Sequence, residues 1–223
     1  MSRRQFDQGL QDLSQPITSL NGSQRTAVDS SLLVPQNNQS YVCGDKSEPL
    51  WRKTVWQVLK DTEAKFGNRN AVLFSQSGIR WSWSEFLQRV DRFAAGLLAI
   101  GLKPGDRLAI WSPNNPQWLI TQFATARIGV ILVTIHPAYK PSELAYALNK
   151  SGAAALVLAP EFRKTNYLSI LLELAPELAD SEPGKLQTPA LEHLNTVITT
   201  DGDEQAGVYT CLLYTSPSPR DRG

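Results

Sequence analysis

The sequence predicts an α/β protein: a doubly wound, mostly parallel sheet with flanking helices and a small β-hairpin. Three short runs are apolar on both sides, at Leu108–Trp111, Val130–Ile135 and Ala153–Leu158. Strands of that kind are typical of the inside of a parallel sheet covered by helices. Stretches with helical apolar spacing separate these runs, and strands that alternate with helices favour right-handed crossover units.

The first elements are expected after Tyr41. A helix ended by Gly67 is predicted because one of its faces collects apolar residues and one threonine: Val55, Val58, Leu59, Thr62 and Phe66. Two short strands, Ala71–Phe74 and Ile79–Trp83, flank the turn residues Ser75–Gly78. They predict a hairpin with both of its indoles on one face.

Ser82 and Glu85 have the spacing of a capping box, in which each side chain accepts a hydrogen bond from the other's backbone N–H. They open a predicted amphipathic helix that ends at Gly101. Its inward face is expected to hold Phe86, Val90, Phe93, Leu97 and Leu98.

The central unit follows the strand Leu108–Trp111. Asn115 suits a helix N-cap, Pro116 suits the first helical position, and Gly129 suits a left-handed C-terminal residue. The apolar face of this helix is predicted from its spacing: Trp118, Leu119, Gln122, Phe123 and Ala126.

A second unit runs from a helix that starts at Pro141 and Glu143, after the poor cap Lys140, to a helix end at Gly152. Leu144 and Leu148 are expected to face inward. After the strand Ala153–Leu158, a long helix toward Pro176 is predicted from its leucines, and Thr196–Thr200 is predicted as a further strand. Those leucines are Leu168, Leu171, Leu172 and Leu174.

Composition narrows the functional classes. The 223 residues carry 22 Lys and Arg against 21 Asp and Glu, so nothing favours a nucleic acid or an acidic membrane as partner. With 42% apolar residues a buried core is feasible, and no apolar run reaches the roughly 20 residues of a membrane span. Two cysteines, Cys43 and Cys211, are too few for a disulfide framework or a zinc site.

Residues 1–40 are rich in Gln, Ser and Asn and are interpreted as a mobile polar leader. They contain three Asp beside three Arg, which argues against a mitochondrial presequence. The cytoplasm is therefore the expected compartment.

Ligands of such sheets bind beyond the carboxyl ends of the strands, which directs attention to the loops Ser112–Asn115 and His136–Lys140. Both should lie at one edge of the sheet. His136 could contact a ligand, although a hydrogen-bonded structural imidazole is the more ordinary role. His193 has no acidic or cysteine cluster around it, and no dinucleotide-binding, phosphate-loop, nucleophile-elbow or Cys-x-x-Cys motif occurs.

With these segments placed, residues 40–200 resemble the amino-terminal part of the AMP-forming acyl-CoA synthetases, in the adenylate-forming ligase superfamily. Three blocks carry the resemblance: Ile79–Leu87 (IRWSWSEFL), Gly105–Asn115 (GDRLAIWSPNN) and Ala126–Tyr139 (ARIGVILVTIHPAY). The opening SYVCG and the run Glu143–Leu148 are similar to the medium-chain fatty acyl-CoA ligase branch. His136 stands where the family often has Asn, so no ligand contact is carried over to it.

The resemblance implies ATP, Mg²⁺ and CoA as cofactors and a fatty acid as substrate of a full-length ligase that forms an acyl adenylate. The phosphate loop, the metal ligand, the ribose-binding Asp and the late lysine of the family have no match here, so catalytic and metal-ligating residues are predicted to be none and cofactor-binding residues stay unknown. Two alternatives remain open: another adenylate-forming ligase, such as an aryl-CoA ligase, and a non-enzymatic α/β ligand-binding or interaction module.

The last residues differ in kind from the rest. Residues 211–221 (CLLYTSPSPRD) are similar to one translated frame of a widely used transposase sequencing adapter. The sequence is therefore divided into a leader at 1–40, a truncated amino-terminal part of an AMP-binding domain at 41–210 and an adapter-derived tail at 211–223. As written, the chain is predicted to be an inactive fragment.

Overall fold

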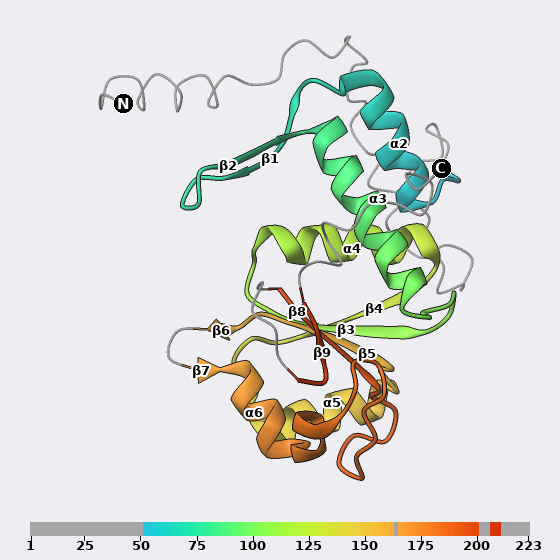
Figure 1. Cartoon of the computed structure of the whole chain (residues 1–223). Coiled ribbons are helices and arrows are strands. Elements are labelled where there is room, and N and C mark those ends of the chain that lie inside the picture. Colours follow the sequence, from blue (N-terminus) through green and yellow to red (C-terminus); the bar gives the residue numbers. More distant parts are fainter. Residues whose placement is uncertain (1–50, 163–164, 201–205, 211–223) are drawn as a thin grey trace, which may run out of the picture. The chain divides into compact units, whose positions relative to one another are not determined.

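The computed structural model describes residues 51–162, 165–200 and 206–210, and the elements discussed lie in the unit Lys53–Gly223. The predicted leader and tail, and the start expected near Tyr41, lie outside the described residues. Figure 1 shows the central sheet with helices on both of its faces.

The sheet has five parallel strands in the order β4-β3-β5-β8-β9. Their bounds are β3 Arg107–Trp111, β4 Ile131–Ile135, β5 Ala155–Leu158, β8 Thr196–Thr199 and β9 Val208–Tyr209. The chain places β4 on one side of β3 and then crosses to place β5 on the other side. This reversal makes the β3/β5 boundary the topological switch point of the sheet, and the predicted fold class is confirmed.

Two hydrophobic cores lie on opposite faces of this sheet, because successive strand residues point to opposite sides. Leu108 and Ile110 of β3 belong to the first core, with α2 (Val55–Phe66), α3 (Trp83–Ala99), α4 (Pro116–Ile128) and the hairpin. Ala109 and Trp111 belong to the second, with α5 (Pro141–Ser151) and α6 (Tyr167–Leu174). Strands β3, β5 and β8 are buried from both sides, which explains their apolar sequences.

Strand β4 is an exception to the expectation that it lies inside the sheet. It is the edge strand of the described sheet, and Ile131 is 53% exposed. Its apolar sequence suggested coverage on both sides, but the described part of the chain covers only some of that surface.

The hairpin pairs β1 (Asn70–Phe74) with β2 (Ile79–Ser82) in antiparallel register. The prediction that both indoles share its face is wrong. Trp81 is buried in the strand, but Trp83 is already the first residue of α3, because Ser82 caps that helix. The capping box itself is confirmed, with Glu85 N donating to Ser82 Oγ at 3.2 Å and Ser82 N donating to Glu85 Oε2 at 2.8 Å.

Helices α2 and α3 form where predicted, but some of the residues expected to face inward do not. Val55 and Phe66 are largely exposed, and Trp56 packs against the core in their place. An indole buries more apolar area than a valine, so rotating the helix toward Trp56 is favourable. In α3, Leu97 is buried and Leu98 is half-exposed, because one helical step turns Leu98 away from the core.

The buried face of α4 agrees with the prediction only in part. Its cap Asn115, its Pro116 and the left-handed Gly129 are confirmed, but the buried helical positions are Pro116, Ile120, Thr121, Ala124 and Thr125. Thr121 and Thr125 can be buried at little cost, because their hydroxyls donate to the carbonyls of Gln117 and Thr121 at 2.7 and 2.9 Å. Of the predicted residues, Trp118, Leu119 and Phe123 are half-buried and pack against the first core, Ala126 is half-buried and Gln122 is exposed.

Helix α5 confirms the buried Leu144 and Leu148, the left-handed Gly152 and the poor cap, since the side chain of Lys140 makes no capping hydrogen bond and its backbone N–H donates to Glu143 Oε2 at 2.7 Å. The helix expected toward Pro176 forms and contains all four predicted leucines, but at eight residues it is short, so only the predicted length is wrong. Before this helix the chain pairs two strands of two residues each, β6 (Glu161–Phe162) and β7 (Thr165–Asn166), in antiparallel register. Helix α6 then ends at Leu174, and the 3₁₀ helix Pro176–Asp180 follows. Asn166 is the N-cap of α6, so the helix cannot begin before Tyr167, and Pro176 is the first residue of the separate 3₁₀ helix.

Candidate functional site

The two loops identified from the sequence lie at the same edge of the sheet. Trp111 pairs with Ile135 at the carboxyl ends of β3 and β4, so Ser112 and His136 leave neighbouring strands together. Leu158 of β5 pairs with Trp111 on the other side, which brings Ala159 and Pro160 to this edge as well. The predicted placement of Ser112–Asn115 beside His136–Lys140 is confirmed.

The polar groups of Ser112–Asn115 bond chiefly to one another and to α4. The Ser112 hydroxyl donates to Pro113 O at 2.8 Å and accepts from Asn115 Nδ2 at 2.9 Å. Asn115 Oδ1 accepts from Trp118 N at 2.8 Å as the helix cap. These bonds hold the loop rigidly, and they leave the exposed Asn114 as the side chain of this loop best placed to meet a ligand.

The turn after β4 is bonded both within itself and from the interior. Tyr139 N donates to His136 O at 3.1 Å, and Ala138 N donates to His136 Nδ1 at 3.2 Å. From the core, Trp111 Nε1 donates to His136 O at 3.2 Å and the Tyr167 hydroxyl donates to Pro137 O at 2.7 Å. The imidazole of His136 is thus hydrogen-bonded within its turn, as the more ordinary of its two expected roles requires.

Burial raises the pKa of Tyr167 to about 12. The phenol, which is protonated at neutral pH even without this rise, thus stays a donor to Pro137 O into the alkaline range. Sequence reasoning missed Tyr167, because it reads as one more apolar residue at the start of a leucine-rich stretch. A tyrosine at a position that must be fully buried is the signal that could have identified it, since a buried phenol needs a partner.

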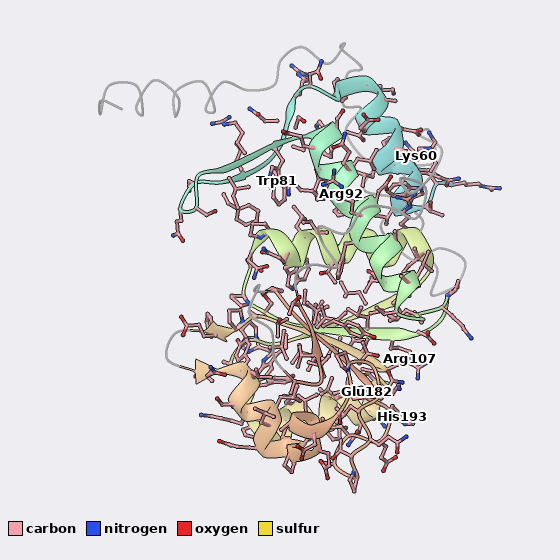
Figure 2. All side chains as sticks on the ribbon, viewed as in Figure 1. Lys60, Trp81, Arg92, Arg107, Glu182 and His193 are labelled. Atoms are coloured by element: carbon pink, nitrogen blue, oxygen red, sulfur yellow. The ribbon has the colours of Figure 1, made fainter. Side chains whose placement is uncertain are left out.

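His193 lies at the opposite edge. The segment before β8 forms a groove of about 720 Å³ whose lining includes Lys185, Glu192 and His193. Figure 2 labels Arg107, Glu182 and His193 near this amino-terminal edge of the sheet. In sheets of this type ligands bind at the carboxyl edge of the strands. This groove lies at the amino-terminal edge, so we do not take it as the candidate site despite its volume.

A second groove, of about 530 Å³, runs along α5. Its lining includes Tyr139, Glu143, Tyr146 and Lys150, so it begins at the turn after β4. Across the described residues, no group of three or more His, Cys, Asp or Glu side chains is arranged to hold a metal ion.

Every helix in the part of the chain that the structure describes is too short or too polar to span a lipid bilayer.

Comparison with known proteins identifies the family. Residues 59–218 match the family of AMP-binding enzymes. The chain belongs to this family. The match includes all three sequence blocks that carried the resemblance.

Curated relatives include the mitochondrial medium-chain acyl-CoA ligase ACSF2 of Danio rerio, 43% identical over 79% of this chain and 29% of the relative. The human protein of the same name is 39% identical over 78% of this chain and 28% of its own length. This AMP-binding family member therefore spans less than a third of the curated relatives it matches.

Solved structures share the fold. A Rhodopseudomonas palustris structure described as a long-chain-fatty-acid CoA ligase has a TM-score of 0.61 and 25% identity, and the match covers 75% of this chain and 37% of that one. The anthranilate CoA ligase AuaEII, solved with anthranoyl-AMP, has a TM-score of 0.62 at 16% identity, covering 77% and 29%. The latter likeness concerns the fold alone.

Proposed function

We propose that this chain is the amino-terminal part of a fatty acid–CoA ligase. In the full-length protein, ATP and a fatty acid would form an acyl adenylate and pyrophosphate, and CoA would then displace AMP. The observation that carries the proposal is the family match over residues 59–218, together with the 43% identity to a medium-chain acyl-CoA ligase. Fatty acid, ATP and CoA are the proposed small-molecule partners.

The described residues do not fit a site for ATP, Mg²⁺ and CoA by themselves. A triphosphate needs several converging N–H groups, a cation and a metal ligand. At the carboxyl edge, Ser112 and Asn115 bond to each other and to α4, and His136 Nδ1 accepts from its own turn. No reaction step is therefore assigned to a residue of the described chain.

The experiment is to determine the native reading frame past Thr210, express the complete protein and measure AMP formation from ATP and CoA with octanoate and with benzoate. Octanoate-dependent AMP would support the proposal. A preference for benzoate would favour an aryl-CoA ligase. A complete frame that activates neither acid and encodes no phosphate loop would favour a binding or interaction module.

The cytoplasm remains the proposed compartment, while the relatives named above carry the designation mitochondrial. The proposal depends on residues 1–40, in which three Asp accompany three Arg. Fusing this segment to a fluorescent protein tests it directly. Diffuse fluorescence would support the cytoplasm, and mitochondrial fluorescence would overturn it.

A further inference from the structure

Two buried aromatic side chains contact consecutive carbonyls of the turn after β4. Trp111, at the end of β3, donates from Nε1 to His136 O at 3.2 Å, and Tyr167, at the start of α6, donates its hydroxyl to Pro137 O at 2.7 Å. Their rings stack with centroids 3.8 Å apart and planes inclined by 14°. Both residues are fully buried.

This arrangement joins three strand ends. Trp111 O accepts from Ala159 N at 3.1 Å after β5, and Pro160 O accepts from Tyr167 N at 3.1 Å. The aromatic pair thus lies at the switch point between β3 and β5 and bonds the turn that follows β4. Moving that turn would leave a buried indole N–H and a buried hydroxyl without partners, which is costly.

The turn after β4 also determines which imidazole nitrogen of His136 carries the proton. Because Nδ1 accepts the Ala138 N–H at 3.2 Å, the proton of the neutral ring must lie on Nε2. The side chain is exposed. A donor at Nε2 is consequently directed away from the turn at the edge where ligands of such sheets bind.

We propose that Trp111 and Tyr167 are positioning residues that lock the His136–Tyr139 turn and thereby fix His136 in its Nε2–H tautomer. The proposal relies on the proposed function only for treating this edge as the ligand side. Neither residue touches a ligand itself. Each acts through the carbonyl that it holds.

The test compares Tyr167→Phe, which keeps the ring and removes the hydroxyl, with Tyr209→Phe. The control removes a similar bond, from Tyr209 to Pro183 O at 3.1 Å, in a different part of the fold. In the full chain, amide hydrogen exchange is measured at Ala138 and Tyr139, and imidazole nitrogen shifts report the tautomer of His136. Neither measurement requires enzymatic activity, so its failure is separate from failure of the proposed function.

Tyr167→Phe should speed exchange at these two amides about fivefold, the loss of one ordinary hydrogen bond. It should also shift His136 toward a tautomer mixture, while Tyr209→Phe changes neither. Equal acceleration of the β3 and β5 amides would mean a general loss of stability and would overturn the proposal. The proposal would also be overturned if His136 of the wild-type protein were not mainly the Nε2–H tautomer. This measurement needs no variant.

Discussion

Gly207→Ala should destabilise the protein far more than Gly78→Ala, although both glycines have a left-handed backbone. Their φ angles are 72° and 66°. A Cβ at Gly78 would meet nothing within 4 Å, but at Gly207 it would lie 2.2 Å from the backbone oxygen of Leu178. Backbone cannot yield as a flexible side chain can, so either β9 or the 3₁₀ helix must move.

The two costs can be estimated separately. An alanine forced into the left-handed region costs roughly 1–2 kcal/mol, and this is the whole expected effect at Gly78. Displacing β9 would also expose Val208, which is only 4% exposed, and a buried side chain of this size contributes about 1.5–3 kcal/mol. Gly207→Ala is therefore expected to lower the free energy of unfolding by about 2.5–5 kcal/mol.

Gly184→Ala provides an intermediate case. Its φ is 82°, and the new Cβ would lie 3.0 Å from the hydroxyl of Tyr209, the far end of a side chain that can shift. Urea denaturation of the three variants should rank Gly78, Gly184 and Gly207 in order of increasing loss. If Gly207→Ala falls within about 0.5 kcal/mol of Gly78→Ala, the size of an ordinary surface change, β9 does not pack on the 3₁₀ helix as described.

A helix cap, the activity of the purified chain and the last residues can each be tested separately. Hydrogen bonds from the backbone and side chain of Ser82 lower the pKa of Glu85, so this carboxylate stabilises the fold above its ordinary pKa of 4.5 and the contribution is lost as pH falls through the lowered pKa. Glu85→Gln should flatten the acid limb of a stability–pH curve, and an unchanged limb would contradict the capping geometry. The purified chain should release no pyrophosphate from Mg-ATP with any fatty acid, and turnover above a no-protein blank would refute this. Amplification of genomic DNA across Thr210 should not recover Cys211 and the residues after it in frame. Their recovery would show that the tail is native. The family match extends to residue 218 and so does not mark a boundary at Thr210.

Helix ends were the most predictable features, because a few local groups determine them. The backbone groups at a helix end are satisfied by residues within one turn of it. Examples are the capping box of Ser82 and Glu85, the N-cap Asn115 before Pro116, and the left-handed Gly152. Strand placement was also predictable where apolar residues ran together. The order of the strands was not predictable, because the side of β3 on which β5 pairs depends on tertiary packing and not on any local residue.

The faces of the helices were harder to predict, because they depend on which neighbour is nearest. Apolar spacing suggested Trp118 and Phe123 for the buried side of α4, and both pack against the core, but Thr121 and Thr125 are buried more completely. Their hydroxyls bond within the helix and so cost little to bury. Strand β9 was missed because a strand of two residues has no period to detect.

The candidate site could be located from the sequence but not described. The rule that ligands lie beyond the carboxyl ends of parallel strands identified both loops. It could not show that Tyr167, more than twenty residues downstream of the turn, bonds Pro137. That contact depends on the β6–β7 hairpin and on the start of α6, which tertiary packing decides.

The carboxyl edge is built from polar groups that mostly hold one another. Ser112 bonds Asn115, Asn115 caps α4, and the carbonyls of His136 and Pro137 accept from buried donors. Such an edge is rigid, and rigidity is what a site needs in order to hold reactants in line. The side-chain donors that face solvent at this edge include the exposed Asn114 and Nε2 of His136. A charged ligand needs several converging donors, so we expect the described residues to serve this edge mainly as a scaffold.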